Sequence, residues 1–184
     1  ALLGDEVVAV IGAGPIGLGA IQFARQPGTK VVAIDISRER LDRCKEAFPD
    51  VDTLLLEPGG ESLADAYRNQ FGGLPEVVIE CTGNNKSMEA AFLLPDFGGR
   101  IVLVGIFLGE LTFNDPEFHK RELSIIGSRN ATAKNFKDVI TQLENGSVNP
   151  ETWITHHCTA EEFPTRIEEW LKPEANLVKG IVSF

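Results

Sequence analysis

The chain has 184 residues, of which 43% are hydrophobic and 24% charged, so it has the composition of an ordinary globular protein and can bury a sizeable core. Its formal net charge of -10 at pH 7 leaves no basic footprint, which argues against nucleic acid and anionic membranes as partners. The three cysteines are far apart and outside any Cys-x-x-Cys arrangement, as is typical of reduced thiols in a cytosolic protein.

The chain begins with Ala1 rather than Met, a few residues before the first apolar run, as expected of a sequence cut at a domain boundary. No basic–apolar–small signal pattern opens it. Its longest uncharged run, which surrounds Pro15, falls short of the ~20 apolar residues of a membrane span. We therefore expect a cytoplasmic protein.

Short runs rich in Val, Ile and Leu alternate with helical patterns as far as Pro150. The runs lack strict alternation, which is typical of strands buried on both faces of a parallel sheet. The predicted strands are Glu6–Ile11, Lys30–Ile34, Thr53–Leu56, Glu76–Glu80, Arg100–Val104 and Leu123–Ile126. The predicted helices are Pro15–Arg25, Arg38–Ala47, Ser62–Gln70, Lys86–Leu94 and Ala133–Asn145. Ser37 is the expected N-cap of the second helix, and Gly146 is the expected C-cap of the last.

This strand–helix repetition predicts an α/β fold with a doubly wound six-stranded parallel sheet, the Rossmann fold, and right-handed crossovers. After Pro150 the rhythm changes. There we predict a short strand at Trp153–Thr155, a helix at Ala160–Leu171 and a strand at Val178–Phe184. Residues 1–150 should form one domain, and residues 151–184 a short C-terminal extension.

The stretch Gly12-Ala13-Gly14-Pro15-Ile16-Gly17 is a Gly-x-Gly-x-x-Gly motif between the first predicted strand and the first predicted helix. The motif is weak evidence by itself, but in this setting it predicts a turn that binds the pyrophosphate of a dinucleotide. The first glycine permits the tight turn, the second lets the backbone approach the phosphates, and the third lets the helix pack closely on the strand. Backbone N–H groups at the helix start would face the phosphates, and proline is favoured there because it removes no helical hydrogen bond.

Asp35 follows the second predicted strand, about twenty residues after the motif, where a carboxylate accepts hydrogen bonds from the adenosine ribose. A carboxylate at this place repels a 2′-phosphate, so Asp35 favours NAD over NADP. Arg38 and Arg40 oppose that preference, because nearby arginines can hold the phosphate. In the alternative interpretation Asp35 is a charge at a helix N-terminus that binds no ligand.

Six segments occur in an order and spacing typical of one family: "GDEVVAVIGAGPIGLGAIQFAR", "VVAIDISRERLDRCKE", "VVIECTGN", "GGRIVLVGI", "RELSIIGSRN" and "WITHHCTAEEF". They resemble the cofactor domain of the zinc-type medium-chain dehydrogenase/reductase family, most closely the branch with sorbitol and threonine dehydrogenases. The stretch "ELSIIGSRNATAKNF", followed by "ITHH", resembles bacterial sugar-acid dehydrogenases such as galactonate 5-dehydrogenases. The resemblance covers nearly the whole chain.

The resemblance implies NAD-binding residues at the carboxyl ends of the predicted strands. Arg40 would lie along the adenine and ribose, and Cys81-Thr82-Gly83 would line the adenine side. Val104-Gly105-Ile106 would face the nicotinamide ribose or carboxamide, and Ser128-Arg129-Asn130 would lie near the nicotinamide, with Arg129 reaching the pyrophosphate or ribose. The full implied set is Gly12, Gly14, Pro15, Ile16, Gly17, Asp35, Ile36, Arg40, Cys81, Thr82, Gly83, Val104, Gly105, Ile106, Ser128, Arg129 and Asn130. Alternatively, Cys81 is a buried small apolar residue and Arg129 a solvated surface arginine.

A complete member of the family has a catalytic domain before the cofactor domain, with zinc ligands that include a Gly-His-Glu stretch. This sequence has no His-Glu dipeptide and no cysteine cluster. His156, His157 and Cys158 are its best metal candidates, but adjacent residues on a strand point to opposite faces and do not easily share an ion. We therefore expect no metal site in this chain and zinc only in the absent catalytic domain, on which residues 151–184 would pack.

The resemblance implies the NAD(H)-binding domain of a zinc-dependent dehydrogenase that transfers a hydride between NAD and a secondary alcohol, such as a polyol or a sugar acid. The chain alone should be inactive, because neither a substrate site nor a Lewis acid is visible in it. Two alternatives stay open. One is a zinc-independent quinone reductase of the same superfamily, against which Asp35 counts, and the other is a non-catalytic NAD-sensing module.

In dehydrogenases of this family, a short strand before the sixth main strand pairs with its symmetry mate. The matching segment here is Glu110–Asn114, with Leu111 and Phe113 at alternate positions. This pattern predicts one apolar face and an edge that invites pairing about a twofold axis. We expect a homodimer through this segment; the alternative is a strand that is covered within one chain.

Overall fold

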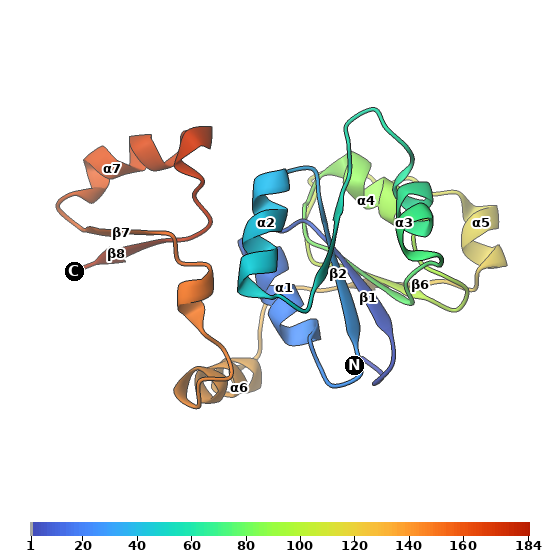
Figure 1. Ribbon diagram of the computed structural model, residues 1–184, viewed down its shortest axis with the longest axis horizontal. Helices are drawn as coiled ribbons and strands as arrows, with labels where there is room; N and C mark the ends of the chain where they lie inside the picture. Colours follow the sequence, from blue (N-terminus) through green and yellow to red (C-terminus); the bar gives the residue numbers. More distant parts are fainter. Residues whose placement is uncertain (1) are drawn as a thin grey trace. The chain divides into compact units, whose positions relative to one another are not determined.

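A computed structural model of the chain describes residues 2–184 (Figure 1). The chain forms two compact units, one ending at Asn130 and the other running from Ala131 to Phe184. The first unit holds a large parallel sheet with its helices. The second holds a helix followed by a small two-stranded sheet.

The large sheet has six parallel strands in the order β3-β2-β1-β4-β5-β6. Its strands are β1 (Val7–Ile11), β2 (Lys30–Asp35), β3 (Asp52–Leu55), β4 (Val77–Glu80), β5 (Arg100–Leu103) and β6 (Ser124–Gly127). Val10 lies beside Ala33 of β2 on one side and beside Ile79 of β4 on the other, so β1 occupies the middle of the sheet. The predicted Rossmann fold is therefore confirmed.

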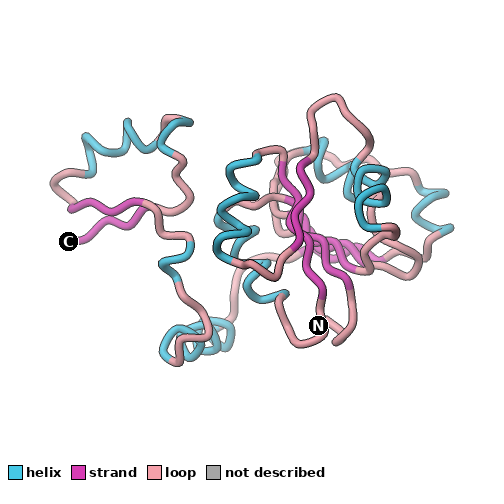
Figure 2. The backbone as a smooth tube through the Cα atoms, in the orientation of Figure 1, coloured by secondary structure: helices cyan, strands magenta, loops and turns pink. Residues whose placement is uncertain are grey.

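Helices cover both faces of this sheet. They are α1 (Pro15–Ala24), α2 (Arg38–Ala47), α3 (Leu63–Phe71), α4 (Asn85–Ala91) and α5 (Asp115–Lys120). Figure 1 shows α1 and α2 on one side of the central strands and α3 and α4 on the other, and Figure 2 shows the strands in magenta between them. Val8, Ala9 and Val10 are all fully buried, which explains why β1 forms an uninterrupted apolar run in the sequence.

Local side chains set the helix starts. Ser37 accepts a hydrogen bond from the N–H of Arg40 and begins α2, as predicted. Asn114 caps α5 in the same way, by accepting the N–H of Glu117 at 3.0 Å, and Pro116 follows in the first turn. The sequence did not reveal α5, because this six-residue helix buries no side chain and so has no apolar face to detect.

The second unit begins with α6 (Ala133–Glu144), whose C-cap is Asn145 rather than the predicted Gly146; Gly146 is the next residue and adopts the left-handed conformation typical of the position after a C-cap. Then come a 3-10 helix, η1 (Pro150–Thr152), the strand β7 (His156–Thr159), the helix α7 (Phe163–Trp170), a second 3-10 helix, η2 (Pro173–Ala175), and the strand β8 (Gly180–Ser183). Strands β7 and β8 pair in parallel, with His156 beside Gly180.

The strand predicted at Trp153–Thr155 is wrong, since the strand begins at His156. Trp153 ends η1 instead, by donating its N–H to the carbonyl of Pro150 at 3.1 Å. Asn149, whose side chain accepts the N–H of Glu151 at 3.1 Å, starts this 3-10 helix. A polar cap therefore overrode the strand preference of the apolar residues that follow it.

Residues 110–114 form no strand in the single chain. The N–H of Thr112 donates to Glu89 of α4 at 3.0 Å, and the side chain of Asn85 donates to the Glu110 carbonyl at 3.4 Å. Leu111 packs on the core, and the Phe113 ring lies 4.9 Å from that of Phe92. The two apolar side chains of this segment are thus used within the chain, and its pairing with a second copy stays a prediction.

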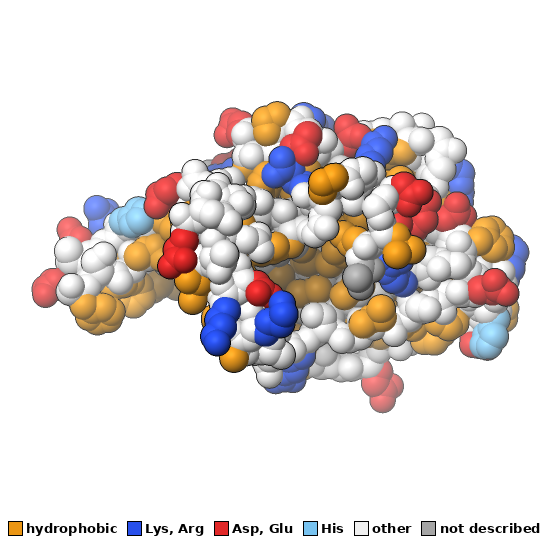
Figure 3. All heavy atoms as spheres, turned by 90° about the horizontal axis from the view of Figure 1, so that it is seen from below, with side chains coloured by type: hydrophobic (Ala, Val, Ile, Leu, Met, Phe, Trp, Pro, Cys, Tyr) orange, Lys and Arg blue, Asp and Glu red, His pale blue; other side chains and the backbone are white. Residues whose placement is uncertain are grey.

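On the face drawn in Figure 3, acidic, basic and hydrophobic side chains all reach the surface. Over the described residues, no helix has the length and apolarity needed to cross a membrane.

Candidate functional site

The predicted site residues of the first unit converge at one edge of the sheet. Because all six strands are parallel, the segments that follow their carboxyl ends share that edge. The chain moves outward from β1 through β2 to β3, then returns to place β4 on the other side of β1. Open α/β sheets bind ligands at such a reversal of strand order.

The glycine turn after β1 has the conformation that its motif requires. Gly12 adopts a φ of +95°, which is strained for other residues, and donates its N–H to the Ile34 carbonyl at 2.7 Å. A Cβ on Gly17 would overlap the Gly12 carbonyl, so only glycine lets α1 approach this closely. Around Gly14, in contrast, no atom beyond its two chain neighbours lies within 4 Å of where a Cβ would be, which leaves room for a ligand.

The N-terminus of α1 opens at this turn. Gly14 is the N-cap and has no side chain to satisfy the first N–H groups, and Pro15 occupies the first turn. The backbone N–H groups of Ile16 and Gly17 have no partner within the helix, because the first turn of any helix lacks carbonyl acceptors. Together with the helix dipole they form a place for an anion.

Asp35, at the end of β2, ties this turn to the neighbouring strand. Its side chain is 5% exposed, one carboxylate oxygen accepts the N–H of Ala13 at 2.7 Å, and the other accepts the N–H of Ser37 at 2.9 Å. Arg40 of α2 lies farther off, with Nη1 3.9 Å from Oδ2. Each carboxylate oxygen has two lone pairs, so both can accept a further hydrogen bond.

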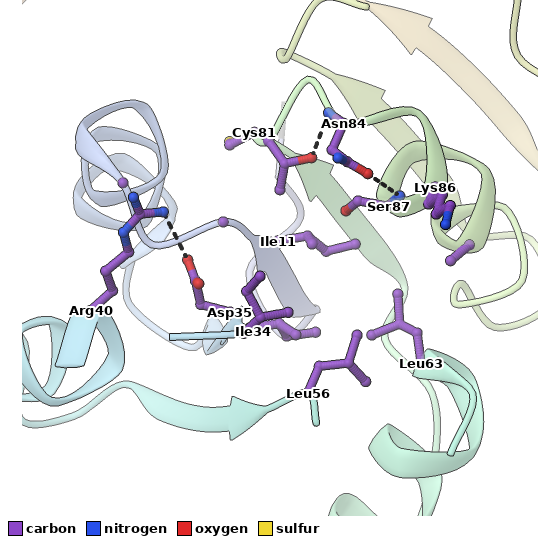
Figure 4. A pocket seen from close by; sticks show the side chains of 15 residues that line it. Ile11, Ile34, Asp35, Arg40, Leu56, Leu63, Cys81, Asn84, Lys86 and Ser87 are labelled. Atoms are coloured by element: carbon purple, nitrogen blue, oxygen red, sulfur yellow. Dashed lines mark hydrogen bonds and ion pairs between the residues drawn. The ribbon is translucent and has the colours of Figure 1, made fainter. Parts of the chain in front are cut away.

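A cavity of about 430 Å³ opens beside this carboxylate. Figure 4 shows Asp35 and Arg40 on one side of it, and Asn84, Lys86 and Ser87 on the other. The predicted residues that line it are Gly12, Gly14, Asp35, Ile36, Arg40, Cys81 and Thr82. The structure adds lining residues that the sequence did not indicate: Ile11, Ile34, Leu56, Leu63, Asn84, Lys86, Ser87 and Ala90. The aliphatic walls suit a flat ring, and the nearby carboxylate suits the hydroxyl groups of a sugar joined to that ring.

The thiol of Cys81 lines this cavity without being reactive. Burial, and to a lesser degree the charge of Glu80, raises the pKa of Cys81 to about 12. The thiol therefore stays protonated near neutral pH, as a nucleophile would not. This agrees with the alternative interpretation of Cys81 as a small packing residue, although it packs at the edge of a cavity.

A second cavity, of about 400 Å³, lies at the ends of β5 and β6. Four predicted residues line it: Gly105, Ile106, Ser128 and Arg129. The remaining predicted residues line neither cavity: Pro15, Ile16, Gly17, Gly83, Val104 and Asn130. Gly83 nevertheless lies between the two groups, since a Cβ there would come 2.9 Å from the Ile106 carbonyl.

One buried group at this edge was missed by the sequence analysis. Glu80, the last residue of β4, is completely buried, and its carboxylate accepts hydrogen bonds from Thr82, Gly83 and Ser87. An acidic residue that ends the apolar run "VVIE" just before Cys81 was the available signal. Pattern alone does not distinguish such a residue from a surface charge at a strand end.

The described residues do not fit a zinc ion. No group of three or more His, Cys, Asp or Glu side chains within residues 2–184 is arranged to hold a metal. His156 packs edge-on against Trp170 at 5.3 Å, His157 is exposed, and Cys158 is buried. We therefore assign no chemical step to a metal held by these residues.

The known proteins to which this chain is similar are named as dehydrogenases. Residues 15–145 match the family model described as zinc-binding dehydrogenase. The chain is 38% identical over 185 residues to L-galactonate-5-dehydrogenase of Escherichia coli K12, covering 100% of this chain and 54% of that protein. It is 34% identical over 173 residues to human sorbitol dehydrogenase, covering 92% of this chain and 47% of the other.

Among solved structures, a short chain alcohol dehydrogenase of E. coli CFT073 complexed with NADH superimposes with a TM-score of 0.84 at 27% identity. The match covers 98% of this chain and 53% of that one. The chain thus spans about half the length of the relatives that it matches.

Proposed function

Because the chain belongs to the zinc-binding dehydrogenase family, we propose that residues 1–150 are the NAD(H)-binding domain of a dehydrogenase that oxidises a secondary alcohol. The observation that carries this proposal is the junction of Asp35 with the glycine turn. A carboxylate for the ribose and the glycine turn that leads into the N-terminus of α1 border one cavity, at the edge where such sheets bind dinucleotides.

The geometry of Asp35 supports NAD rather than NADP as the cofactor. Both carboxylate oxygens are held by backbone N–H groups, of Ala13 and Ser37, so the side chain cannot swing away from an incoming 2′-phosphate. Two negative groups would then be forced together in a largely buried place. Arg40 offsets this only weakly, since its guanidinium is mostly exposed and 3.9 Å from the carboxylate.

The relatives support a polyol or sugar acid as the substrate of the complete protein. They include proteins named for galactonate, arabinitol and sorbitol. We propose that the substrate and the zinc ion bind in the part of the complete protein that lies outside this chain, and that residues 151–184 pack against that part. This chain would bind NAD, and the segments after β5 and β6 would orient its nicotinamide ring.

We further propose a homodimer through residues 110–114. The position of this segment supports the proposal: Glu110, Thr112, Phe113 and Asn114 are exposed, and two hydrogen bonds join the segment to α4. A second copy would pair with its outer side.

A fluorescence titration of the chain with NADH tests the cofactor proposal. Binding should raise and shift the nicotinamide emission, and NADPH should bind at least tenfold more weakly because of the charge on Asp35. Absence of any NADH binding at millimolar concentration would refute the proposal. Equal affinity for the two cofactors would refute the preference alone.

A further inference from the structure

We propose that Glu80 is a positioning residue for the cofactor crevice, which holds the turns after β4 and β5 where they meet a bound dinucleotide. This inference rests on the proposed function. It assigns to a buried carboxylate a task that neither the glycine motif nor Asp35 performs.

The Glu80 carboxylate is surrounded by hydrogen-bond donors from one short segment. Thr82 contributes its hydroxyl and its N–H, which is 3.2 Å from each carboxylate oxygen. The N–H of Gly83 lies 3.4 Å from Oε2, and the hydroxyl of Ser87 lies 3.0 Å from Oε1. The side chain therefore fixes the turn after β4 and joins it to the first turn of α4.

The same residue also holds the turn after β5. Its backbone carbonyl accepts the N–H groups of Val104 and Gly105, both at 2.9 Å. A Cβ on Gly105 would lie 2.9 Å from Oε2 of Glu80 and would overlap the N–H of Gly83. The two turns are therefore in direct contact, and a displacement of residues 82–83 must also move residues 105–106.

These turns reach both cavities of the site. Thr82, Asn84 and Ser87 line the larger cavity, whereas Gly105 and Ile106 line the smaller one. Glu80 lines neither and lies beneath both turns, so it acts on a ligand only through the residues that it holds. It is a positioning residue and not a contact residue.

A carboxylate is the side chain that this environment demands. It offers only acceptors, whereas a glutamine amide would direct an NH₂ group at one of the backbone N–H groups. The hydroxyls of Thr82 and Ser87 can rotate to accept a hydrogen bond, but the N–H groups of Thr82 and Gly83 cannot. Because the Thr82 N–H lies 3.2 Å from both carboxylate oxygens, an amide NH₂ would oppose it in either orientation, and the turn should move to relieve this contact between two donors.

The test compares two glutamate-to-glutamine substitutions in the full chain. Glu80→Gln changes the buried carboxylate, and Glu76→Gln is the matched control. Glu76 precedes the opposite end of β4, and its Oε2 accepts the N–H of Val7 at 2.8 Å. NADH affinity is measured by fluorescence at a temperature where circular dichroism shows each variant to be folded, and stability is measured by urea unfolding.

We expect both substitutions to lower stability, but only Glu80→Gln to weaken NADH binding, by about tenfold, the equivalent of one lost hydrogen bond. Unchanged NADH affinity in Glu80→Gln would overturn the proposal. So would an equal loss in Glu76→Gln, since it would reveal a general loosening of the fold. If the unsubstituted chain binds no NADH, it is the proposed function that fails.

If Glu80→Gln does not unfold cooperatively, Glu80→Asp decides. This variant keeps the charge but draws the oxygens back by one methylene, away from Gly83 and Ser87. A weakened NADH affinity supports the positioning role. An affinity equal to that of the unsubstituted chain overturns it.

Discussion

The carboxylate of Asp35 accepts the N–H of Ala13 at 2.7 Å, so the acidic residue that ends β2 holds the glycine turn that follows β1. A hydrogen bond to an ionised acceptor is stronger than one between neutral groups. The carboxylate proposed to bind the ribose and the turn proposed to bind the phosphates are therefore directly joined and should move together. Changing Asp35 should affect both.

Replacing Asp35 by alanine should weaken NADH binding by about tenfold or more, because a charged acceptor for the ribose is lost. NADPH binding should change much less, because the repulsion of its 2′-phosphate is lost as well. Titrations with NADH and with NADPH measure the ratio of the two dissociation constants. Asp52→Ala is the control, since Asp52 begins β3 and pairs with Lys30 at 3.4 Å, away from the cavity. A ratio unchanged by Asp35→Ala would contradict the assignment.

The chain alone should form no NADH from NAD and a panel of polyols, sugar acids and secondary alcohols. The reason is that the substrate site is proposed to lie in the half of its relatives that this chain does not span. Absorbance at the NADH band measures the reaction, with a complete sorbitol dehydrogenase as the positive control. NADH formation by the chain that a Gly14→Leu substitution abolishes would show that the catalytic groups lie within it.

The chain should be a dimer in solution if residues 110–114 pair as proposed. Light scattering at high micromolar concentration measures the mass, and Phe113→Asp should shift it toward the monomer. Because the Phe113 ring also lies 5.2 Å from that of Phe118, thermal unfolding must confirm that the variant is folded. Leu171→Asp, at an exposed position of the second unit, is the control. A monomer before any substitution would refute the interface.

Tyr67→Phe should leave the free energy of unfolding unchanged or raise it by up to about 1 kcal/mol. The Tyr67 hydroxyl is buried and has no hydrogen-bond partner among the described residues, and burial raises the pKa of its phenol. Removing the hydroxyl therefore removes a desolvation cost and no bond. Urea unfolding measures the change, with Tyr67→Ala as the contrast, which should cost about 3–5 kcal/mol because it opens a cavity. A loss in Tyr67→Phe as large as in the contrast would contradict the prediction.

The ion pair between Glu6 and Arg100 should make stability depend on pH in the acidic range. Two hydrogen bonds, of 2.6 and 2.8 Å, from the Arg100 guanidinium hold the pKa of Glu6 below its ordinary value. A carboxyl group whose pKa is lowered by folding stabilises the fold above its unfolded-state pKa. That contribution is lost as the pH falls through the folded-state pKa.

Glu6→Gln should accordingly be less stable than the unsubstituted chain at pH 7, and the difference should shrink as the pH falls below about 4. Urea unfolding at a series of pH values measures both curves. Parallel curves over the whole range would show that the pair contributes no pH-dependent stability.

The sequence alone determined most of the fold. The strands of the large sheet are apolar runs bounded by turn residues, and Ser37 marks the start of α2, because these signals act over a few neighbouring residues. The glycine motif and Asp35 were likewise recognisable, since strand, turn and helix occur there in immediate succession. The spacing of the glycines along the chain determines where each one lies in the turn between strand and helix.

Only the tertiary structure decided which groups meet across distant segments. Glu80 looks like an ordinary acidic residue at a strand end, and its role depends on the turn after β5 lying against the turn after β4. Leu111 and Phe113 form an alternating pattern that predicts an edge for pairing, yet within the single chain Leu111 packs on the core and the Phe113 ring lies 4.9 Å from that of Phe92. The local sequence pattern predicts that a segment has a face to be buried. Which other segment covers that face depends on how the whole chain packs.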